Sequence, residues 1–486
     1  MATISLLQQP NILEPINSDL WFKVNSASSS TTNFKYIFRP QYRLEPFTGA
    51  YTTLSIYKVP PRPITGDGLF SPNRVLKSFI QNMVNPYSTA FVSGYNTSLP
   101  GIPASYIDYN VKYGFEYSPN VAWYNTSNLS GYVGLTFSSA HEFAVGDILI
   151  LDKDNKTINQ SYDGTCSVTQ VVNTFQIKTD ITYGVAPTSG TEPGVITTLQ
   201  RLTATSSTGR YTWNGTRQYM EVNTNFTNQF ILASASTDFL TEWPASTYKS
   251  VQLDDYETVS MILQGATNSV LYVNTYNSGN TLLNTYGFTI SNSNNYRRVD
   301  FGIGPKNLMN AGVSLTDVDN YRFYTKYAGA TSSVFRYYKI NNQCSNYEKV
   351  RVAFLNRAGG FDYFNFTLDS KRSVNVSRTE YEKVLAYNYT IGDRGKTILA
   401  QKAEPKMTIT SNWITEKESV WLEELITSPE VYVLGNTSNL GTAATGYKLP
   451  IVVTDNNYEV KTYLRNQVFN LQLNFKYAYD LNLQNE

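Results

Sequence analysis

Alternating runs of apolar and polar residues recur along the chain and predict antiparallel β-strands. In residues 349–366, KVRVAFLNRAGGFDYFNF, two such runs flank a break at 356–360. The break holds Gly359 and Gly360, which we expect to supply the positive φ of a tight reversal. An aromatic-rich hairpin of this kind has to be covered by another part of the chain or by a neighbouring subunit. We therefore predict a structural hairpin here, without catalytic chemistry.

Two segments show the periodicity of amphipathic helices instead. The first follows Ser71 and Pro72, a favourable N-cap and first helical residue. The second follows Thr415, with Glu418 three residues later, which is the pattern of a capping box. The apolar stripes predicted for these helices are Val75, Leu76, Phe79 and Ile80 for the first, and Val420, Trp421, Leu422, Leu425 and Ile426 for the second.

The spacing of the strands changes along the chain and predicts four domains. Short strands and turns between 128 and 200 are typical of a small inserted β-barrel module. Longer alternating strands between 201 and 340 predict a β-sandwich domain of the jelly-roll type. We expect an N-terminal β domain with one helix at 1–127, and a C-terminal β domain with one helix at 341–486 that pairs with it. The predicted fold class is mainly β, with antiparallel β-sandwich or jelly-roll domains, a small inserted β-barrel module and two isolated α-helices.

The composition is poor in charge and rich in aromatic residues. Charged residues make up 16% of the chain, and 39 basic residues face 38 acidic ones, which gives a net charge of +1. We therefore expect no nucleic acid as a partner and no attraction to anionic lipid. The 38 tyrosines and 24 phenylalanines suit extensive contacts between protein subunits, because interfaces favour tyrosine and disfavour lysine and glutamate. AT-rich codon usage is an alternative explanation of the same composition.

Cysteine usage and hydropathy exclude several classes of protein. Cys166 and Cys344 are the only cysteines, so a disulfide scaffold is excluded and two unpaired buried thiols are expected. Residues 1–15 lack the basic start and the apolar run of a secretory signal. No run of 18 apolar residues occurs, so we expect no insertion into a membrane.

Histidine, the usual general base at neutral pH, occurs once, at His141. It lies in a polar turn of the small module beside Glu142, and we expect a surface or turn role for it. One histidine and two distant cysteines do not supply the three or four ligands of a zinc site.

Two loops resemble ligand-binding motifs only superficially. Residues 152–163 have carboxylates at the spacing of a calcium loop, but Lys156 stands at position five, where a ligand belongs. Residues 392–397, GDRGKT, end like a phosphate-binding loop, but Thr390 stands where that pattern requires glycine. We interpret the first as a hydrated turn and reject the second.

Paired carboxylates are the remaining candidates for acid–base chemistry, as in a glycosidase. Asp254-Asp255 lies between strands and is expected to form a turn. The pairs Glu416/Glu418 and Glu423-Glu424 fall on the second predicted helix, whose solvent face needs charges.

Three tryptophans, Trp123, Trp213 and Trp243, could stack on sugar rings, but burial in a core or an interface is the interpretation we favour. We therefore assign no catalytic, cofactor-binding or metal-binding residue. We expect no enzyme activity and no cofactor.

Segments spread along the chain carry a further signal. They are VRVAFLNR at 350–357, GGFDYF at 359–364, SNW at 411–413, WLEELITSP at 421–429, PIVVTD at 450–455, and the strand at 54–59 followed by 68–70. Together they resemble a recurring virion structural protein of tailed bacteriophages, especially crAss-like and marine phages of Bacteroidetes hosts. The module at 134–179 is similar to a small β-domain common in phage tail and fibre proteins.

The resemblance implies a tail, collar or baseplate protein that forms a symmetric ring or fibre with copies of itself, next to other tail and neck proteins. The implied location is the virion, assembled in the cytoplasm of the bacterial host. Two alternatives stay open. One is a tail fibre or receptor-binding protein that holds host-surface glycan, and the other is a tail-spike depolymerase, which needs a pair of carboxylates.

Overall fold

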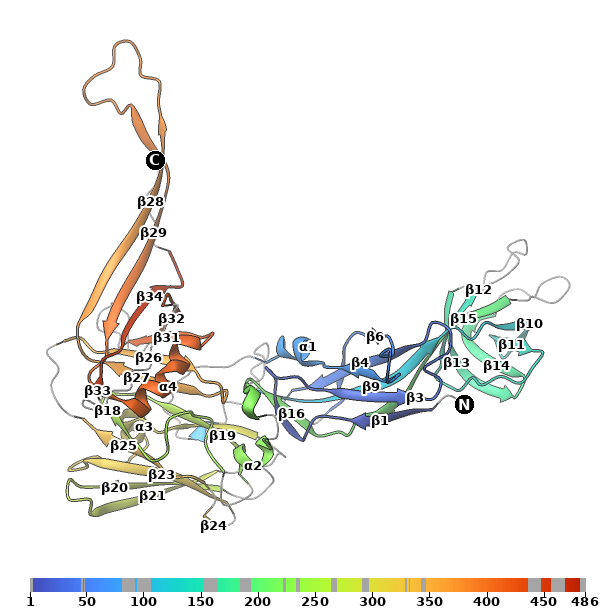
Figure 1. The fold of residues 1–486 in the computed structure, drawn as a ribbon, viewed down its shortest axis with the longest axis horizontal. Coiled ribbons are helices and arrows are strands. Elements are labelled where there is room, and N and C mark those ends of the chain that lie inside the picture. Colours follow the sequence, from blue (N-terminus) through green and yellow to red (C-terminus); the bar gives the residue numbers. More distant parts are fainter. Residues whose placement is uncertain are drawn as a thin grey trace. The chain divides into compact units, whose positions relative to one another are not determined.

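The structure is a computed structural model. It describes residues 3–44, 47, 49–80, 92–93, 106–152, 164–183, 194–221, 224–232, 237–263, 269–290, 297–327, 330–331, 333–341, 347–435, 447–455 and 468–480. The chain forms two compact units, Met1–Gln81 with Pro100–Trp213, and Asn82–Leu99 with Asn214–Glu486. Strands make up most of the regular structure in both units (Figure 1). The predicted fold class, mainly β, is confirmed.

The first unit contains a sheet built around β9 (Tyr106–Tyr117). One edge of β9 pairs with β4 (Lys35–Arg43), and the other with β15 (Gly194–Thr205) and β16 (Arg210–Trp213). Of the strand expected at 54–59, only the last three residues form a strand, β6 (Tyr57–Val59). The other strands are β1 (Ile4–Gln8), β2 (Leu13–Pro15), β3 (Phe22–Ser26), β5 (Thr52–Thr53), β6 (Tyr57–Val59) and β7 (Gly68–Phe70).

Six strands of the first unit close into a small barrel, as the sequence predicts. Their order is β10-β11-β14-β13-β12-β15, and β10 also pairs with β15, which closes the ring. The predicted boundaries of this module, at 127/128 and 200/201, fall inside β10 and β15. The division of the chain into four domains and the pairing of the terminal domains stay predictions. The barrel strands besides β15 are β10 (Val121–Leu129), β11 (Tyr132–Phe137), β12 (Ile148–Asp152), β13 (Gly164–Asn173) and β14 (Gln176–Thr182).

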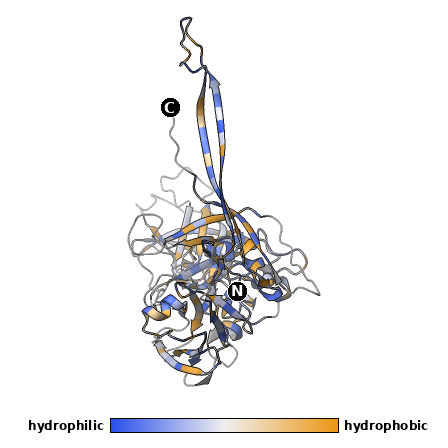
Figure 2. Ribbon diagram, turned by 90° about the vertical axis from the view of Figure 1, so that its left-hand side faces the viewer, coloured by the Kyte–Doolittle hydropathy of each residue, from blue (hydrophilic) through white to orange (hydrophobic). Residues whose placement is uncertain are grey.

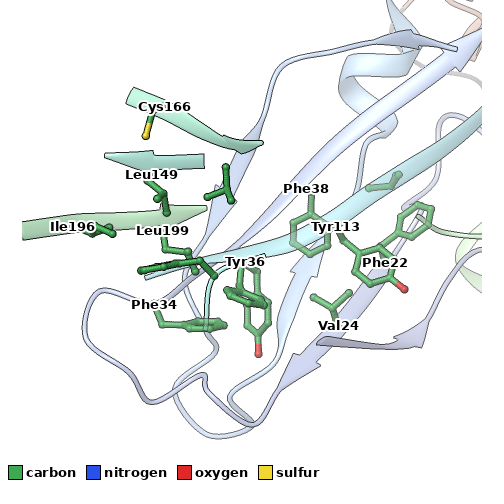
Figure 3. Packing of buried hydrophobic residues seen from close by; sticks show 14 of the residues in the cluster. Phe22, Val24, Phe34, Tyr36, Phe38, Tyr113, Leu149, Cys166, Ile196 and Leu199 are labelled. Carbon is green, nitrogen blue, oxygen red and sulfur yellow. The ribbon is translucent and has the colours of Figure 1, made fainter. Parts of the chain in front are cut away.

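One apolar core extends through the open sheet and the barrel of the first unit. Phe22 and Phe38 pack beside β9, and Leu149 and Cys166 lie at the barrel end of the same cluster (Figure 3). Cys166 is buried and unpaired, as predicted, and burial raises the pKa of its thiol to about 12. It is therefore a packing residue and not a reactive thiolate. Cys344 lies outside the described residues.

The second unit contains two sheets packed face to face, the sandwich expected between 201 and 340. Their strand orders are β17-β19-β22-β8 and β18-β25-β23-β20-β21. Met261 and Phe301 from the first sheet share one buried core with Leu271 and Phe323 from the second. The strands are β8 (Val92–Ser93), β17 (Ile231–Leu232), β18 (Tyr248–Val251), β19 (Thr258–Leu263), β20 (Ser269–Tyr276), β21 (Leu282–Ile290), β22 (Arg297–Gly302), β23 (Asn320–Tyr327), β24 (Ala330–Thr331) and β25 (Arg336–Ile340).

Both predicted helices are present. The first, α1 (Asn73–Lys77), is only five residues long, and its N-cap position is taken by Pro72 and not by Ser71. The second, α4 (Glu416–Thr427), has the predicted capping box between Thr415 and Glu418. Within the described residues, no helix combines the length and the apolar character needed to cross a membrane. Other short helices there are η1 (Tyr219–Glu221), α2 (Phe226–Phe230) and α3 (Pro305–Asn310).

A seven-stranded antiparallel sheet, in the order β27-β26-β31-β32-β34-β29-β28, forms the rest of the second unit. β26 (Val350–Leu355) and β27 (Phe361–Phe366) make the predicted hairpin. Trp421 of α4 packs on Phe354 and Phe364, so the chain itself supplies the cover of that face. The other strands of this sheet are β28 (Ser370–Glu382), β29 (Lys396–Thr410), β31 (Val431–Gly435), β32 (Tyr447–Val453) and β34 (Gln472–Tyr477). β30 (Ile414–Thr415) and β33 (Val468–Phe469) form a separate two-stranded sheet.

β28 and β29 continue beyond this sheet as a two-stranded ribbon, here called the arm (residues 370–410; Figures 1 and 2). The ladder between them runs from Ser370 opposite Ile409 to Glu382 opposite Lys396, whereas β34 pairs only with residues 406–410 of β29. Every residue of β28 after the first is exposed. The pattern of apolar residues does not predict these two strands.

The turn between β26 and β27 uses its two glycines differently from our expectation. Gly359 has a φ of +84°, as a tight reversal requires. Gly360 is needed for space, because a Cβ there would lie 1.9 Å from the carbonyl oxygen of Leu240 in the sandwich.

We expect Gly360→Ala to lower the free energy of unfolding by about 2–4 kcal/mol, because backbone must move to admit the methyl group. Gly359→Ala should lower it by about 1–2 kcal/mol through the left-handed φ. Urea unfolding of the full chain measures both. Gly392→Ala is the control, since its Cβ would meet only Thr390 Oγ1, at 3.8 Å. Wild-type stability of Gly360→Ala would contradict the close packing.

Candidate functional site

Ionisable side chains gather at two places beside the β26–β27 hairpin, both within the second unit. We call them the Arg351 network and the Arg357 cluster. The Arg351 network comprises Lys249, Asp255, Glu257, Lys349 and Arg351, and the Arg357 cluster comprises Glu221, Glu242, Arg357 and Glu424.

The guanidinium of Arg351, on β26, is buried between two carboxylates. Nη1 lies 3.1 Å from Asp255 Oδ2, and Nη2 lies 2.8 Å from Glu257 Oε2. Nε and Nη2 also donate to the carbonyl of Tyr256, and Nη1 donates to the side chain of Asn365. All five N–H donors of the guanidinium are therefore engaged, which holds both acids in one geometry.

Two lysines complete the charge balance of the Arg351 network. Lys349 Nζ lies 2.8 Å from Asp255 Oδ1, and Lys249 Nζ lies 2.6 Å from Glu257 Oε1. Burial raises the pKa of Asp255, but the attraction of Arg351 and Lys349 outweighs burial and holds that pKa below its usual value. Asp255 is therefore an ionised structural residue, whereas a general acid needs a raised pKa.

The predicted turn at Asp254-Asp255 is present, but only one of its acids faces solvent. The side chain of Asp254 is 55% exposed, whereas that of Asp255 is fully buried. The sequence missed this difference because the cations that hold Asp255 come from residues 349 and 351, far along the chain.

The Arg357 cluster lies at the turn between β26 and β27. The guanidinium of Arg357 reaches Glu242 at 3.0 Å, Glu221 at 3.3 Å and Glu424 at 3.5 Å. The backbone N–H of Arg357 donates to Glu424 Oε2 at 2.9 Å. Three carboxylates thus surround one cation. Their ion pairs with Arg357 tie α4, which carries Glu424, and the segments that carry Glu221 and Glu242 to the hairpin turn.

The excess of carboxylates favours binding of a proton. Burial, assisted by the nearby charge of Glu242, raises the pKa of Glu424 to about 7, although the backbone N–H and the guanidinium of Arg357 oppose the shift. Burial also raises the pKa of Glu242. Glu424 was expected on the solvent face of its helix, and that expectation is wrong. It follows Trp421 by three residues, so it flanks the buried stripe and reaches the turn.

Asp362 of β27 lies beside this cluster and is also buried. It accepts hydrogen bonds from the indole Nε1 of Trp421 at 3.0 Å, from the backbone N–H of Glu242 at 3.2 Å and from the hydroxyl of Thr241. Both carboxylate oxygens have donors, which is the arrangement of a structural acid.

His141 holds a turn of the barrel. Its Nε2 lies 3.0 Å from the carbonyl oxygen of Asn173, its Nδ1 accepts the backbone N–H of Phe143, and its ring stacks on Phe143. The nearby acid, Asp147, is buried in an ion pair with Arg201 at 2.5 Å. These contacts engage both groups in the structure of the turn.

The remaining residues and motifs that the sequence offered as candidates do not form a binding or catalytic site in the described residues. Trp123, Trp213 and Trp243 are at most 3% exposed, so they do not form a platform for sugar rings. The calcium-like loop lies, after Asp152, outside the described residues. Residues 392–395 of the GDRGKT motif lie in the loop at the end of the arm, and Lys396 and Thr397 are the first residues of β29. In the part of the chain that the structure describes, no group of three or more His, Cys, Asp or Glu residues could hold a metal ion.

No protein-family model and no curated protein matches the chain. It is weakly similar to the solved structure of trypsin-activated alpha-2-macroglobulin from Escherichia coli, with 7% identity and a TM-score of 0.14, over 93% of this chain and 42% of that one. It is also weakly similar to dimeric latent PorU from Porphyromonas gingivalis, with 9% identity and a TM-score of 0.14, over 70% of this chain and 34% of that one. The chain thus matches less than half the length of either protein, and scores this low support no argument about fold or function.

We expect Arg351→Met to lower the free energy of unfolding by about 3–5 kcal/mol, because it leaves two buried carboxylates without their shared cation. Guanidinium unfolding of the full chain measures the loss. Arg74→Met, at an exposed position of α1, is the matched control and should change stability by less than about 0.5 kcal/mol. A loss no greater than that of the control would show that Arg351 does not hold the hairpin.

The Arg357 cluster predicts a specific dependence of stability on pH. The folded pKa of Glu424 lies above its ordinary value of 4.5, so its stabilising effect is present below about pH 4.5 and is lost as pH rises through about 7. We expect the stability difference between wild type and Glu424→Gln to change by about 3 kcal/mol across this window. Unfolding at several pH values measures it. Glu423→Gln, at the exposed neighbouring position, is the control, and a difference that stays constant with pH would contradict the raised pKa.

Proposed function

We propose that this chain is a structural component of a bacteriophage virion, a tail, collar or baseplate protein that assembles with copies of itself. The observation that carries the proposal is the arm, which extends from the second unit as a two-stranded ribbon (Figure 2). A ribbon of two strands is only marginally stable in water. A second protein surface is therefore needed to hold it.

The loop at the end of the arm supports the same conclusion. Val384, Tyr387 and Ile391 have side chains that are 100% exposed or more by relative area. Grouped apolar side chains of this exposure mark an interaction site. Their burial against another subunit supplies a driving force for assembly.

The base of the arm is held firmly, which suits a part that positions a partner. Met407 and Ile409, at the end of β29, belong to the buried core between the seven-stranded sheet and α4. The hairpin of that sheet is in turn fixed to the sandwich through the Arg351 network. The base of the arm is therefore pre-ordered, and this part loses little conformational freedom when the arm binds.

A second feature that supports assembly is the distribution of charge. The arm carries eight basic and four acidic residues, whereas the rest of the chain has 31 basic and 34 acidic ones. Opposite net charges on the arm and on the remainder favour contact between copies of one chain. Neighbouring tail and neck proteins of the virion are further partners in this proposal.

We expect the purified full-length chain to form oligomers, visible as symmetric rings or fibres by negative-stain electron microscopy. The triple variant V384S/Y387S/I391S should sediment as smaller species, because the apolar end of the arm no longer favours burial. V145S is the control, since Val145 is 64% exposed on the barrel. A wild-type chain that stays monomeric at every concentration tested by analytical ultracentrifugation would contradict the proposed function.

A further inference from the structure

β28 is the longest end strand among the sheets of the described residues. It has 13 residues, against nine in β21, which ends one sheet of the sandwich, and six in β27, which lies at the opposite end of the same seven-stranded sheet. β27 is mostly buried, whereas β28 is exposed along its length. A long exposed edge presents a row of backbone donors and acceptors to a further strand.

Proteins that keep such an edge free commonly place proline or an inward charge on it. β28 contains no proline, while β29 contains Pro405 opposite Val374. The side of the ribbon formed by β28 is therefore the side more open to strand addition.

The sequence of β28 is complementary to itself when two copies run antiparallel. Its first part carries Lys371 and Arg372, its middle carries Val374 and Val376, and its last part carries acids. An antiparallel copy brings the basic start of one strand against the acidic end of the other, where Glu380 and Glu382 lie. Opposite charges across a ladder stabilise pairing, and like charges destabilise it.

The register of such a pair follows from symmetry. A two-fold axis perpendicular to the sheet keeps each face on its own side, so allowed registers differ in steps of two residues. Pairing over all 13 residues of β28 puts Val376 on the axis and Arg372 opposite Glu380 of the second copy, twice. Shifting the register by two residues in one direction places Arg372 opposite Arg378 of the second copy. The same shift in the other direction places Lys371 opposite Lys383. Of these three registers, only the full-length one avoids like charges directly opposite each other, and it also pairs the largest number of β28 residues.

We infer that β28 pairs with β28 of a second copy of this chain, in antiparallel register about Val376. The two arms then form one four-stranded sheet, β29-β28-β28-β29, and the apolar stripe of Val374 and Val376 meets its counterpart. This inference rests on the proposed function and specifies one contact of the assembly. The experiments distinguish a failure of the β28–β28 pairing from a failure of the proposed function.

Cysteine cross-linking of the full-length chain tests the register. In the inferred pair the two Val376 Cα atoms lie about 5 Å apart, within the range of a disulfide. Val376→Cys should therefore form a covalent dimer under mild oxidation, seen on non-reducing gels. Val374→Cys is the matched control, because its two Cα atoms would be separated by about 13 Å along the strands. The wild-type chain reports any background from Cys166 and Cys344.

Charge reversal tests the pairing without a covalent bond. Arg372→Glu should weaken self-association about tenfold or more, because two attractive pairs become repulsive. The double variant R372E/E380R restores the opposite charges in exchanged positions and should return association close to the wild-type value. Analytical ultracentrifugation at low salt gives the dissociation constants.

Each outcome decides between the two proposals. A covalent dimer of the Val376→Cys variant but not of the Val374→Cys variant, with rescue by the double charge variant, supports the inferred pair. Oligomers that persist while the Val376→Cys variant fails to cross-link, or while the double charge variant fails to rescue, overturn the arm pairing and leave the proposed function standing. A chain that is monomeric and floats with phosphatidylglycerol vesicles overturns both, since the arm would then bind lipid.

Discussion

The second unit depends on the burial of one arginine between two acids. Arg351 on β26 meets Asp255 and Glu257 from the turn that precedes β19. Removing three charges from water is costly, and the gain in attraction compensates only when every donor and acceptor is satisfied. The five engaged N–H groups of Arg351 meet that condition. The network therefore permits one position of the hairpin against the sandwich, which an apolar contact alone would define less strictly.

This constraint explains which parts of the fold the sequence could predict. Alternation of apolar residues and the capping box report contacts within a few residues, and they correctly predicted the β26–β27 hairpin and the start of α4. The closed barrel was predictable for a similar reason, since its strands all come from one continuous stretch of the chain. Ion pairs between residues 67 to 136 positions apart leave no such local signal. For this reason Asp255 was expected only as part of a turn, and Glu424 as a solvent-facing residue.

The arm was missed for a different physical reason. Strand prediction relies on one apolar face packed against a core, and β28 offers only Val374 and Val376 in 13 residues. Its backbone forms a ladder with β29, and all its residues after the first are exposed. In the proposed assembly this segment completes its packing against a second copy, which would account for its weak strand pattern and its exposed charges. The self-complementary order of charges in β28 is the signal that could have revealed it.

The Arg351 network and the arm are connected through the strands at the base of the arm. Residues 406–410 of β29 pair with β34, and the sheet continues through β32 and β31 to β26, where Arg351 lies. A strand ladder transmits position well because its hydrogen bonds fix both spacing and direction. An error in the seating of β26 would therefore tilt the arm, and a small tilt at the base becomes a large displacement at its end. The proposed assembly through the arm therefore requires an unambiguous position of the hairpin, and the buried ion network supplies that position at the expense of desolvating its charges.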